Sequence, residues 1–204
     1  MLNIAVLVSG GGTNLQSIID SIENGYLKDV AIKYVISDKE GVYALERAKA
    51  HNIETLAFDK KIYKKDLSNK LYDILKGKVD LIVLAGYLSI VSSPLIDGFK
   101  DKIINIHPAL IPSFCGKGMY GLNVHKEAIR YGVKVSGCTV HFVDENMDTG
   151  AIILQNTVKV HSKDTPEVLQ QKVLLEEHKA LPLAIKLISD NKVVIEDRKV
   201  TIKE

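Results

Sequence analysis

The chain has 204 residues, 46% hydrophobic and 25% charged, a composition that fits a globular domain and excludes disordered, collagen-like and coiled-coil proteins. Lysine and arginine number 27 against 25 acidic residues, so a net charge of +2 provides no strong field for nucleic acid or a membrane surface. Cys115 and Cys138 form neither a CxxC pair nor a ligand cluster, so we expect no disulfide scaffold and no metal site. Because no signal-peptide pattern or long apolar stretch occurs, we expect a single-domain cytoplasmic protein with no nucleic-acid or membrane partner.

The first half of the chain alternates short apolar runs with segments of helical periodicity. The runs predict strands at residues 2–8, 31–36, 55–58, 81–85 and 103–107. The segments between them predict helices from Thr13 to the stop at Gly25, and at 42–50 and 63–76, with Thr13 and Gln16 forming a capping box. This alternation is typical of an α/β fold: a Rossmann-like open sheet, mostly parallel, with helices on both faces.

The second half begins with a region rich in proline and glycine. Residues 108–121 predict a long loop of the kind that usually covers a site. We then expect a helix at 122–131 and strands at 135–143 and 151–160, whose direction relative to the first sheet the sequence leaves open. A long helix capped by Thr165 should end near Ser189. A short hairpin at 193–202, turning at Glu196 and Asp197, completes the expected C-terminal strand pair and long helix.

A glycine-rich segment lies between the first predicted strand and the first predicted helix. It reads Ser9-Gly10-Gly11-Gly12-Thr13-Asn14. Glycines there let an anion approach the backbone, and the first amides of the helix bind it, so the segment favours a phosphate. Since neither G-x-G-x-x-G nor the P-loop pattern is present, we interpret the ligand as a monophosphate. The alternative is a tight turn that needs glycine only for its shape.

Asn105 and His107 end the fifth predicted strand. Being two positions apart, they project to the same face of the strand, at the sheet edge where open α/β folds bind ligands. An amide and an imidazole there could stabilise an oxyanion and carry a proton, although a structural histidine is the alternative. Asp148 lies in an Asp-Thr-Gly turn and, if it reached His107, would orient the imidazole. These residues alone indicate an enzyme that binds a phosphorylated metabolite and moves a proton at a histidine.

Five segments of the chain form a recognisable set. They read SGGGTNLQ at 9–16, LAGYL at 84–88, NIHPALIPS at 105–113, HFVDE at 141–145 and DTGAII at 148–153. Together they closely resemble the phosphoribosylglycinamide formyltransferase family of folate-dependent enzymes. The resemblance extends from Ile4 to about Pro182. It implies transfer of a formyl group from 10-formyltetrahydrofolate to the amine of glycinamide ribonucleotide in purine biosynthesis, with no metal. The chain would act as a monomer or homodimer.

The resemblance also implies roles for individual residues. The expected catalytic residues, with Asp148 tuning His107 and relaying the proton, are Asn105, His107 and Asp148. The residues expected to bind the ribonucleotide are Gly12, Thr13, Asn14, Pro108 and Glu177. The residues expected to bind the folate are Lys61, Leu88, Ser89, Ile90, Val91, Asn105, Val143 and Asp144. For Glu177 the alternative is a solvated helix residue, and Lys61 and Ser89 stand where many family members carry arginine.

Three alternatives remain: a formyltetrahydrofolate hydrolase, a methionyl-tRNA formyltransferase, or a non-catalytic sugar-phosphate or folate binding protein. The hydrolase usually carries a further N-terminal domain, which we do not expect because Met1 lies close to the first predicted strand. The tRNA enzyme carries a further C-terminal domain, for which we expect no room in 204 residues. The presence of Asn105, His107 and Asp148 argues against the third. We therefore expect one formyltransferase domain over residues 1–204. Its phosphate-binding βαβ half would end near residue 105, and its catalytic and folate-binding half would begin near residue 106.

Overall fold

The structure of the chain is a computed structural model that describes residues 1–203. The chain divides into two compact units, Met1–Asn105 and a second unit that begins at Ile106. The strand order of the main sheet is β3-β2-β1-β4-β5-β6-β7, and its first five strands are parallel. This order confirms the predicted Rossmann-like, mostly parallel α/β fold.

The strands of the first unit follow the apolar runs closely. They are β1 Leu2–Val8, β2 Val30–Ser37, β3 Glu54–Ala57, β4 Leu81–Leu84 and β5 Ile103–His107, the last of which continues past the end of the unit. All of β4 is buried, and β1 is buried from Ile4 to Val8. Such burial on both faces explains why these strands read as continuous apolar runs.

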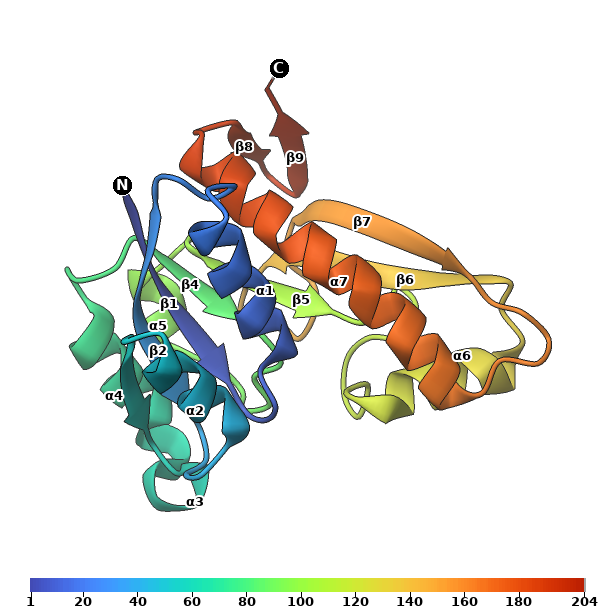
Figure 1. Cartoon of the computed structure of the whole chain (residues 1–204), viewed down its shortest axis with the longest axis horizontal. Helices are drawn as coiled ribbons and strands as arrows, with labels where there is room; N and C mark the ends of the chain where they lie inside the picture. Colours follow the sequence, from blue (N-terminus) through green and yellow to red (C-terminus); the bar gives the residue numbers. More distant parts are fainter. Residues whose placement is uncertain (204) are drawn as a thin grey trace. The chain divides into compact units, whose positions relative to one another are not determined.

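The helices of the first unit cover both faces of the sheet. They are α1 Thr13–Glu23, α2 Tyr43–Ala50, α3 Lys60–Tyr63, the 3₁₀ turn η1 Lys64–Asp66, α4 Leu67–Leu75 and α5 Leu95–Gly98. Crossovers between parallel strands are right-handed, so α1 and α2, on the outward path from β1 to β3, lie on one face. The chain returns to β4 through α4, which lies on the other face (Figure 1).

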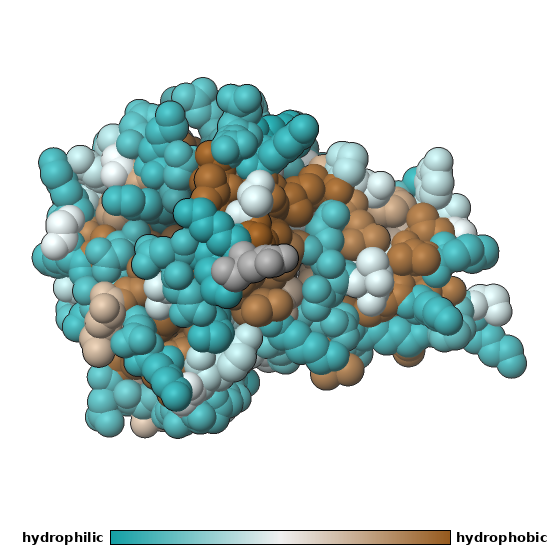
Figure 2. Space-filling view, turned by 90° about the horizontal axis from the view of Figure 1, so that it is seen from above, coloured by the Kyte–Doolittle hydropathy of each residue, from teal (hydrophilic) through white to brown (hydrophobic). Residues whose placement is uncertain are grey.

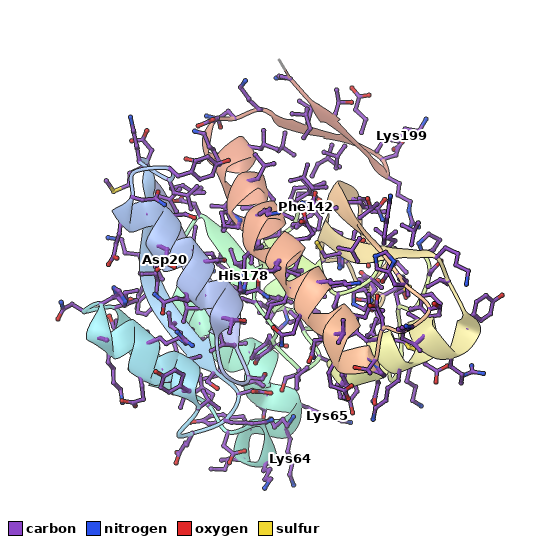
Figure 3. The ribbon with its side chains drawn as sticks, turned by 45° about the vertical axis from the view of Figure 1, so that its right-hand side comes forward. Asp20, Lys64, Lys65, Phe142, His178 and Lys199 are labelled. Carbon is purple, nitrogen blue, oxygen red and sulfur yellow. The ribbon has the colours of Figure 1, made fainter. Side chains whose placement is uncertain are left out.

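Two local predictions for these helices are wrong. Gly12, and not Thr13, is the N-cap of α1, with a left-handed φ of 73° and no side-chain capping bond, so there is no capping box. The single helix expected at 63–76 is broken because Lys64 adopts a positive φ of 46° between α3 and α4. Asp59 starts α3 earlier than expected by accepting a hydrogen bond from the Lys61 amide at 2.8 Å. The break leaves Lys64 and Lys65 exposed (Figure 3).

The second unit contains a strand pair covered by a long helix. Its elements are α6 Leu122–Tyr131, β6 Val135–Phe142, β7 Ile152–Lys159, α7 Pro166–Ser189, β8 Val193–Glu196 and β9 Lys199–Ile202. Strands β6 and β7 are antiparallel to each other, and α7 packs along both (Figure 1). Thr165 caps α7 as predicted, by accepting from the Val168 amide.

The C-terminal hairpin turns one residue later than predicted. Glu196 pairs with Lys199, so the turn residues are Asp197 and Arg198. Asp197 has a positive φ of 54°, which an aspartate tolerates in a tight turn.

The surface is mixed in character. Hydrophilic residues cover most of the face shown in Figure 2, and hydrophobic side chains are visible between them. Folded proteins normally expose apolar atoms in this way, so the pattern alone does not mark a docking surface. Among the described residues, no helix is long and apolar enough to cross a membrane.

Candidate active site

The glycine-rich turn of the first unit joins β1 to α1 and presents backbone to solvent. Gly10 and Gly11 are exposed, and a Cβ built on either would have no atom of residues 1–203 within 4 Å, apart from the glycine itself and its two chain neighbours. Gly12 is different, because its Cβ would lie 2.6 Å from Cβ of Ala44 in α2 and its φ is positive. Glycine is therefore required at Gly12 for packing against α2, whereas Gly10 and Gly11 leave room for a ligand to approach.

Helix α2 holds this turn through two hydrogen bonds. The Ala44 amide donates to the Gly10 carbonyl at 3.1 Å, and Arg47 Nε donates to the Gly11 carbonyl at 2.8 Å. Arg47 Nη1 also donates to Gln16 Oε1 of α1 at 3.0 Å. These bonds fix the carbonyls of the turn beside the N-terminus of α1, where free amides and the helix dipole favour an anion. Thr13 is exposed there and Asn14 is buried, and their contact with a phosphate stays a prediction.

The segment at 88–91, predicted to bind folate, also lies in the first unit. Leu88 and Ile90 expose 46% and 75% of their surface, which leaves apolar side chains open to a flat ligand. The Leu88 amide donates to Ser9 Oγ at 2.8 Å, and Ser89 Oγ donates to Asp38 Oδ2 at 2.6 Å. Lys61 lies exposed on α3, next to Lys60, whose Nζ is 3.6 Å from the same Asp38 oxygen.

Strand β5 carries the two polar residues that the sequence analysis singled out. Asn105 is partly exposed and His107 is only 4% exposed, while Ile106 between them is buried. His107 Nε2 lies 2.9 Å from the Phe114 carbonyl. Because a carbonyl only accepts, the ring donates through Nε2 and turns Nδ1 elsewhere. The loop at 108–121 thus folds back onto the imidazole.

In the second unit, the structure brings Asp148 beside His107. His107 Nδ1 is 3.9 Å from Asp148 Oδ2, a charge-pair distance that is too long for a direct hydrogen bond. The Gly116 amide donates to the same Oδ2 at 2.8 Å and holds the carboxylate in place. Asp148 itself has a positive φ of 56°, so its backbone is constrained where its side chain meets the imidazole. The loop at 108–121 therefore contacts both His107 and Asp148.

Two further histidines belong to this cluster, and sequence reasoning assigned no role to them. His141 Nε2 is 3.8 Å from Asp148 Oδ1, and His141 Nδ1 donates to the Phe142 carbonyl at 2.7 Å. Burial lowers the pKa of His141, with partial opposition from the Phe142 carbonyl and from Asp148. Burial, and then the charge of His107, lower the pKa of His125 on α6 to about 4. Both rings are therefore neutral at pH 7.

The sequence contained a weak signal for each of these two histidines. His141 lies between Val140 and Phe142, two apolar residues that are buried on β6 (Phe142 is labelled in Figure 3). His125 occupies the buried stripe of α6 with Val124 and Ala128. A polar ring at a buried position of an amphipathic element is the pattern that could have identified both.

The remaining predicted contacts are scattered over the second unit. Glu177 on α7 is 8% exposed, so the solvated alternative is wrong. Burial, and then the charge of Glu177, raise the pKa of Cys138 on β6. Asp144 shapes its own loop, because its Oδ1 accepts from the Asn146 amide at 3.1 Å and from Thr149 Oγ1 at 2.6 Å. Pro108 and Val143 are partly exposed. Within residues 1–203, no group of three or more potential ligands could hold a metal ion.

Comparison with known proteins identifies the family. The formyl transferase family matches residues 2–185. A chloroplastic phosphoribosylglycinamide formyltransferase of Arabidopsis thaliana is 42% identical over 183 residues, which cover 86% of this chain and 61% of that protein. The human trifunctional purine biosynthetic protein adenosine-3 is 40% identical over 193 residues, covering 93% of this chain and 18% of that protein. This chain thus spans less than two thirds of either relative.

A solved structure agrees with these matches. Glycinamide ribonucleotide transformylase 1 from Symbiobacterium toebii superimposes with a TM-score of 0.94 at 42% identity, covering 100% of this chain and 95% of that chain. A family match over nearly the whole chain, supported by an equally extensive structural match, shows that this chain belongs to the formyl transferase family.

Proposed function

We propose that the chain transfers the formyl group of 10-formyltetrahydrofolate to the amine of glycinamide ribonucleotide, a step of purine biosynthesis. The products are N-formylglycinamide ribonucleotide and tetrahydrofolate. The observation that carries the proposal is the pairing of His107 with Asp148 at 3.9 Å inside a buried cluster, in a chain whose relatives carry this activity in their names.

The chemistry requires an oxyanion to be stabilised and a proton to be moved. The amine nitrogen attacks the formyl carbon, a C–N bond forms, and the carbonyl electrons move to oxygen. Asn105 and a protonated His107 stabilise this oxyanion by hydrogen bonding as its charge develops. When the tetrahedral centre collapses, the bond to N10 of the folate breaks, and the proton lost by the amine reaches N10. Asp148 is our candidate for that relay.

The neutral neighbouring rings and the two partners of its own ring favour His107 as the proton carrier of the cluster. Burial lowers the pKa values of His125 and His141, so these two rings stay neutral at pH 7. His107 directs one nitrogen to the Phe114 carbonyl and the other toward Asp148. A protonated ring at His107 can therefore donate to the carbonyl and face the carboxylate at the same time.

The acceptor would be bound through its phosphate. We assign this contact to Gly12, Thr13 and Asn14 at the start of α1, with the exposed Gly10 and Gly11 leaving space for the phosphate oxygens. Pro108 and Glu177 are our candidates for contacts to the glycinamide end. Holding both substrates removes much of the entropic cost of their meeting, so neither Cys115 nor Cys138 is needed as a nucleophile.

The donor would be bound by backbone groups and apolar side chains. We assign it to Leu88, Ser89, Ile90 and Val91 in the first unit, and to Asn105, Val143 and Asp144. Lys61 supplies an exposed positive charge for the glutamate tail of the folate, but without the two-pronged geometry of arginine. Formyl transfer to an amine requires no metal ion.

A spectrophotometric assay tests the proposal. Purified protein is mixed with a 10-formylfolate donor, with and without glycinamide ribonucleotide, and the absorbance of the deformylated folate is followed. Release that requires the ribonucleotide supports transfer. Release without it indicates a hydrolase, and a lack of release under both conditions indicates a binding protein.

Location and assembly belong to the same proposal. We propose a cytoplasmic protein that acts as a monomer or homodimer. Light scattering during size-exclusion chromatography measures the mass in solution, and a mass above that of two chains would contradict the proposed assembly.

A further inference from the structure

Three chain segments of the first unit meet at the carboxyl ends of adjacent parallel strands. Ser9 follows β1, Asp38 follows β2, and the segment at 88–91 comes shortly after β4. The sheet order β2-β1-β4 makes these strands neighbours, so their ends lie along one edge. That edge is where open α/β sheets hold ligands.

Two side-chain hydrogen bonds tie the 88–91 segment to this edge. Ser9 Oγ accepts from the Leu88 amide at 2.8 Å, and Asp38 Oδ2 accepts from Ser89 Oγ at 2.6 Å. Within the described residues, the segment belongs to no helix or strand, so no regular backbone ladder fixes its conformation. Its course therefore depends on Ser9 and Asp38.

Asp38 contributes little to the stability of the fold at this position. Its side chain is fully buried, and within residues 1–203 its Oδ1 has no hydrogen-bond partner. The nearest cation, Lys60 Nζ, is 3.6 Å from Oδ2 and is partly exposed. A buried carboxylate that is only half satisfied contributes little net stability. Burial, and then the Asp38 charge, raise the pKa of Tyr87, the residue that precedes Leu88.

We propose that Ser9 and Asp38 are positioning residues for the formyl donor, because their side chains hold the 88–91 segment in the conformation that binds it. The inference rests on the proposed function, which assigns that segment to the donor. It adds two residues outside the segment and gives each a single hydrogen bond through which it acts. Neither residue needs to touch either substrate.

Ser9 allows the effects on donor and acceptor binding to be separated. Ser9 is the first residue of the glycine-rich turn that we assign to the acceptor phosphate, yet its hydroxyl bonds to the donor segment. The turn has its own support from α2, through the Ala44 amide and Arg47 Nε. Loss of the Ser9 hydroxyl should therefore disturb binding of the donor and leave binding of the acceptor intact.

Steady-state kinetics of Ser9→Ala and Ser89→Ala, with each substrate varied in turn, test the inference. We expect the donor KM to rise about 5- to 10-fold in each variant, the scale of one lost hydrogen bond, and the acceptor KM to stay within about twofold. Ser89→Thr, which keeps the hydroxyl, should restore most of the donor affinity. Asp38→Asn keeps an acceptor for Ser89 and avoids a buried cavity, so its donor KM should rise by less than that of Ser89→Ala.

Ser93→Ala is the matched control. Ser93 Oγ also donates to an aspartate, Asp97, but this pair is exposed and outside the 88–91 segment. Its donor KM should equal that of the unmodified protein. An unchanged donor KM in Ser89→Ala, or an equal rise in both KM values in Ser9→Ala, would overturn the inference.

Equilibrium binding separates this inference from the proposed function. A stable 10-formylfolate analogue is titrated into each variant by calorimetry, with thermal unfolding measured on the same samples. If the unmodified protein binds the analogue but shows no ribonucleotide-dependent turnover, the proposed reaction is wrong. Weaker analogue binding by Ser9→Ala and Ser89→Ala at unchanged unfolding temperature would still support the positioning role, and equal binding would refute it.

Discussion

The glycine-rich turn and the histidine–aspartate cluster differ in the groups that they offer a ligand and in the exposure of those groups. The turn offers exposed main chain, with Gly10 and Gly11 open to solvent and α2 behind them. The cluster uses titratable side chains, with His107, His125 and His141 each no more than 4% exposed. Main-chain amides bind an anion well beside water, whereas proton transfer benefits from a site that water does not dilute. Residues of the turn should therefore govern the affinity for the acceptor, and residues of the cluster should govern the rate of the chemical step.

The strongest test of this separation is His107→Ala. Loss of the imidazole removes the proposed oxyanion donor and proton carrier, so we expect kcat to fall at least about 100-fold. The turn is built from other residues, so the affinity for glycinamide ribonucleotide, measured by calorimetry, should change little.

His161→Ala is the control for this variant, because His161 is exposed and outside the cluster. It should keep full turnover. Turnover near the unmodified value in His107→Ala would remove His107 from the chemistry.

Asp148→Asn should have the next largest effect. Asparagine tolerates the left-handed φ of 56° at this position and can still accept from the Gly116 amide, so the loop should keep its shape. Only the negative charge is lost, and we expect kcat to fall about 10-fold or more while both KM values stay within about threefold. A kcat equal to that of the unmodified protein would show that the charge takes no part in the reaction.

The two regions also differ in how far the sequence could predict them. The turn is contiguous, so its glycines and its place between a strand and a helix were readable directly. The meeting of His107 with Asp148 depends on how β5, the loop and the β6–β7 connection fold, and no local pattern contains that information. The support of the turn by Arg47 from α2 was hidden for the same reason.

The fold shows the same division between local and tertiary information. Apolar runs and cap residues predicted β1, β5 and α7 closely, because a buried strand is a run of consecutive apolar residues and the Thr165 cap directly precedes its helix. The break at Lys64 carried no glycine or proline to signal it, since a lysine adopts the positive φ there. The direction of β6 against β7 is a property of pairing, which periodicity does not encode.

Substitutions at Gly11 and Gly12 test the space that the turn leaves for a phosphate. Gly11→Ala places a methyl group where, beyond its two chain neighbours, no atom of the described residues lies within 4 Å, so the fold should tolerate it. The methyl group would crowd an approaching phosphate, and we expect the KM for glycinamide ribonucleotide to rise about 10-fold with kcat and the donor KM nearly unchanged. Steady-state kinetics with each substrate varied measures this.

Gly12→Ala should behave differently from Gly11→Ala. Its methyl group would lie 2.6 Å from Ala44 Cβ and its φ is positive, so thermal unfolding should occur at a lower temperature. Equal losses of stability in both variants would mean that the space beside Gly11 is not free.

The smallest effect we expect is a change in stability with pH, and it comes from His125 in the buried cluster. Burial holds the pKa of His125 at about 4 in the folded chain, below its ordinary value of 6.5. Between these two pH values the unfolded chain binds a proton that the folded chain does not, so the free energy of unfolding falls as the pH drops from about 6.5 to about 4.

His125→Leu removes this group, and the difference in unfolding free energy between pH 7 and pH 5 should shrink by about 1 kcal/mol. His141, whose pKa is also lowered, should maintain part of the difference. Urea unfolding at both pH values measures the change, with His161→Leu as the control. An unchanged difference would mean that His125 takes up its proton without unfolding, and the cluster would then be more open to water than its burial indicates.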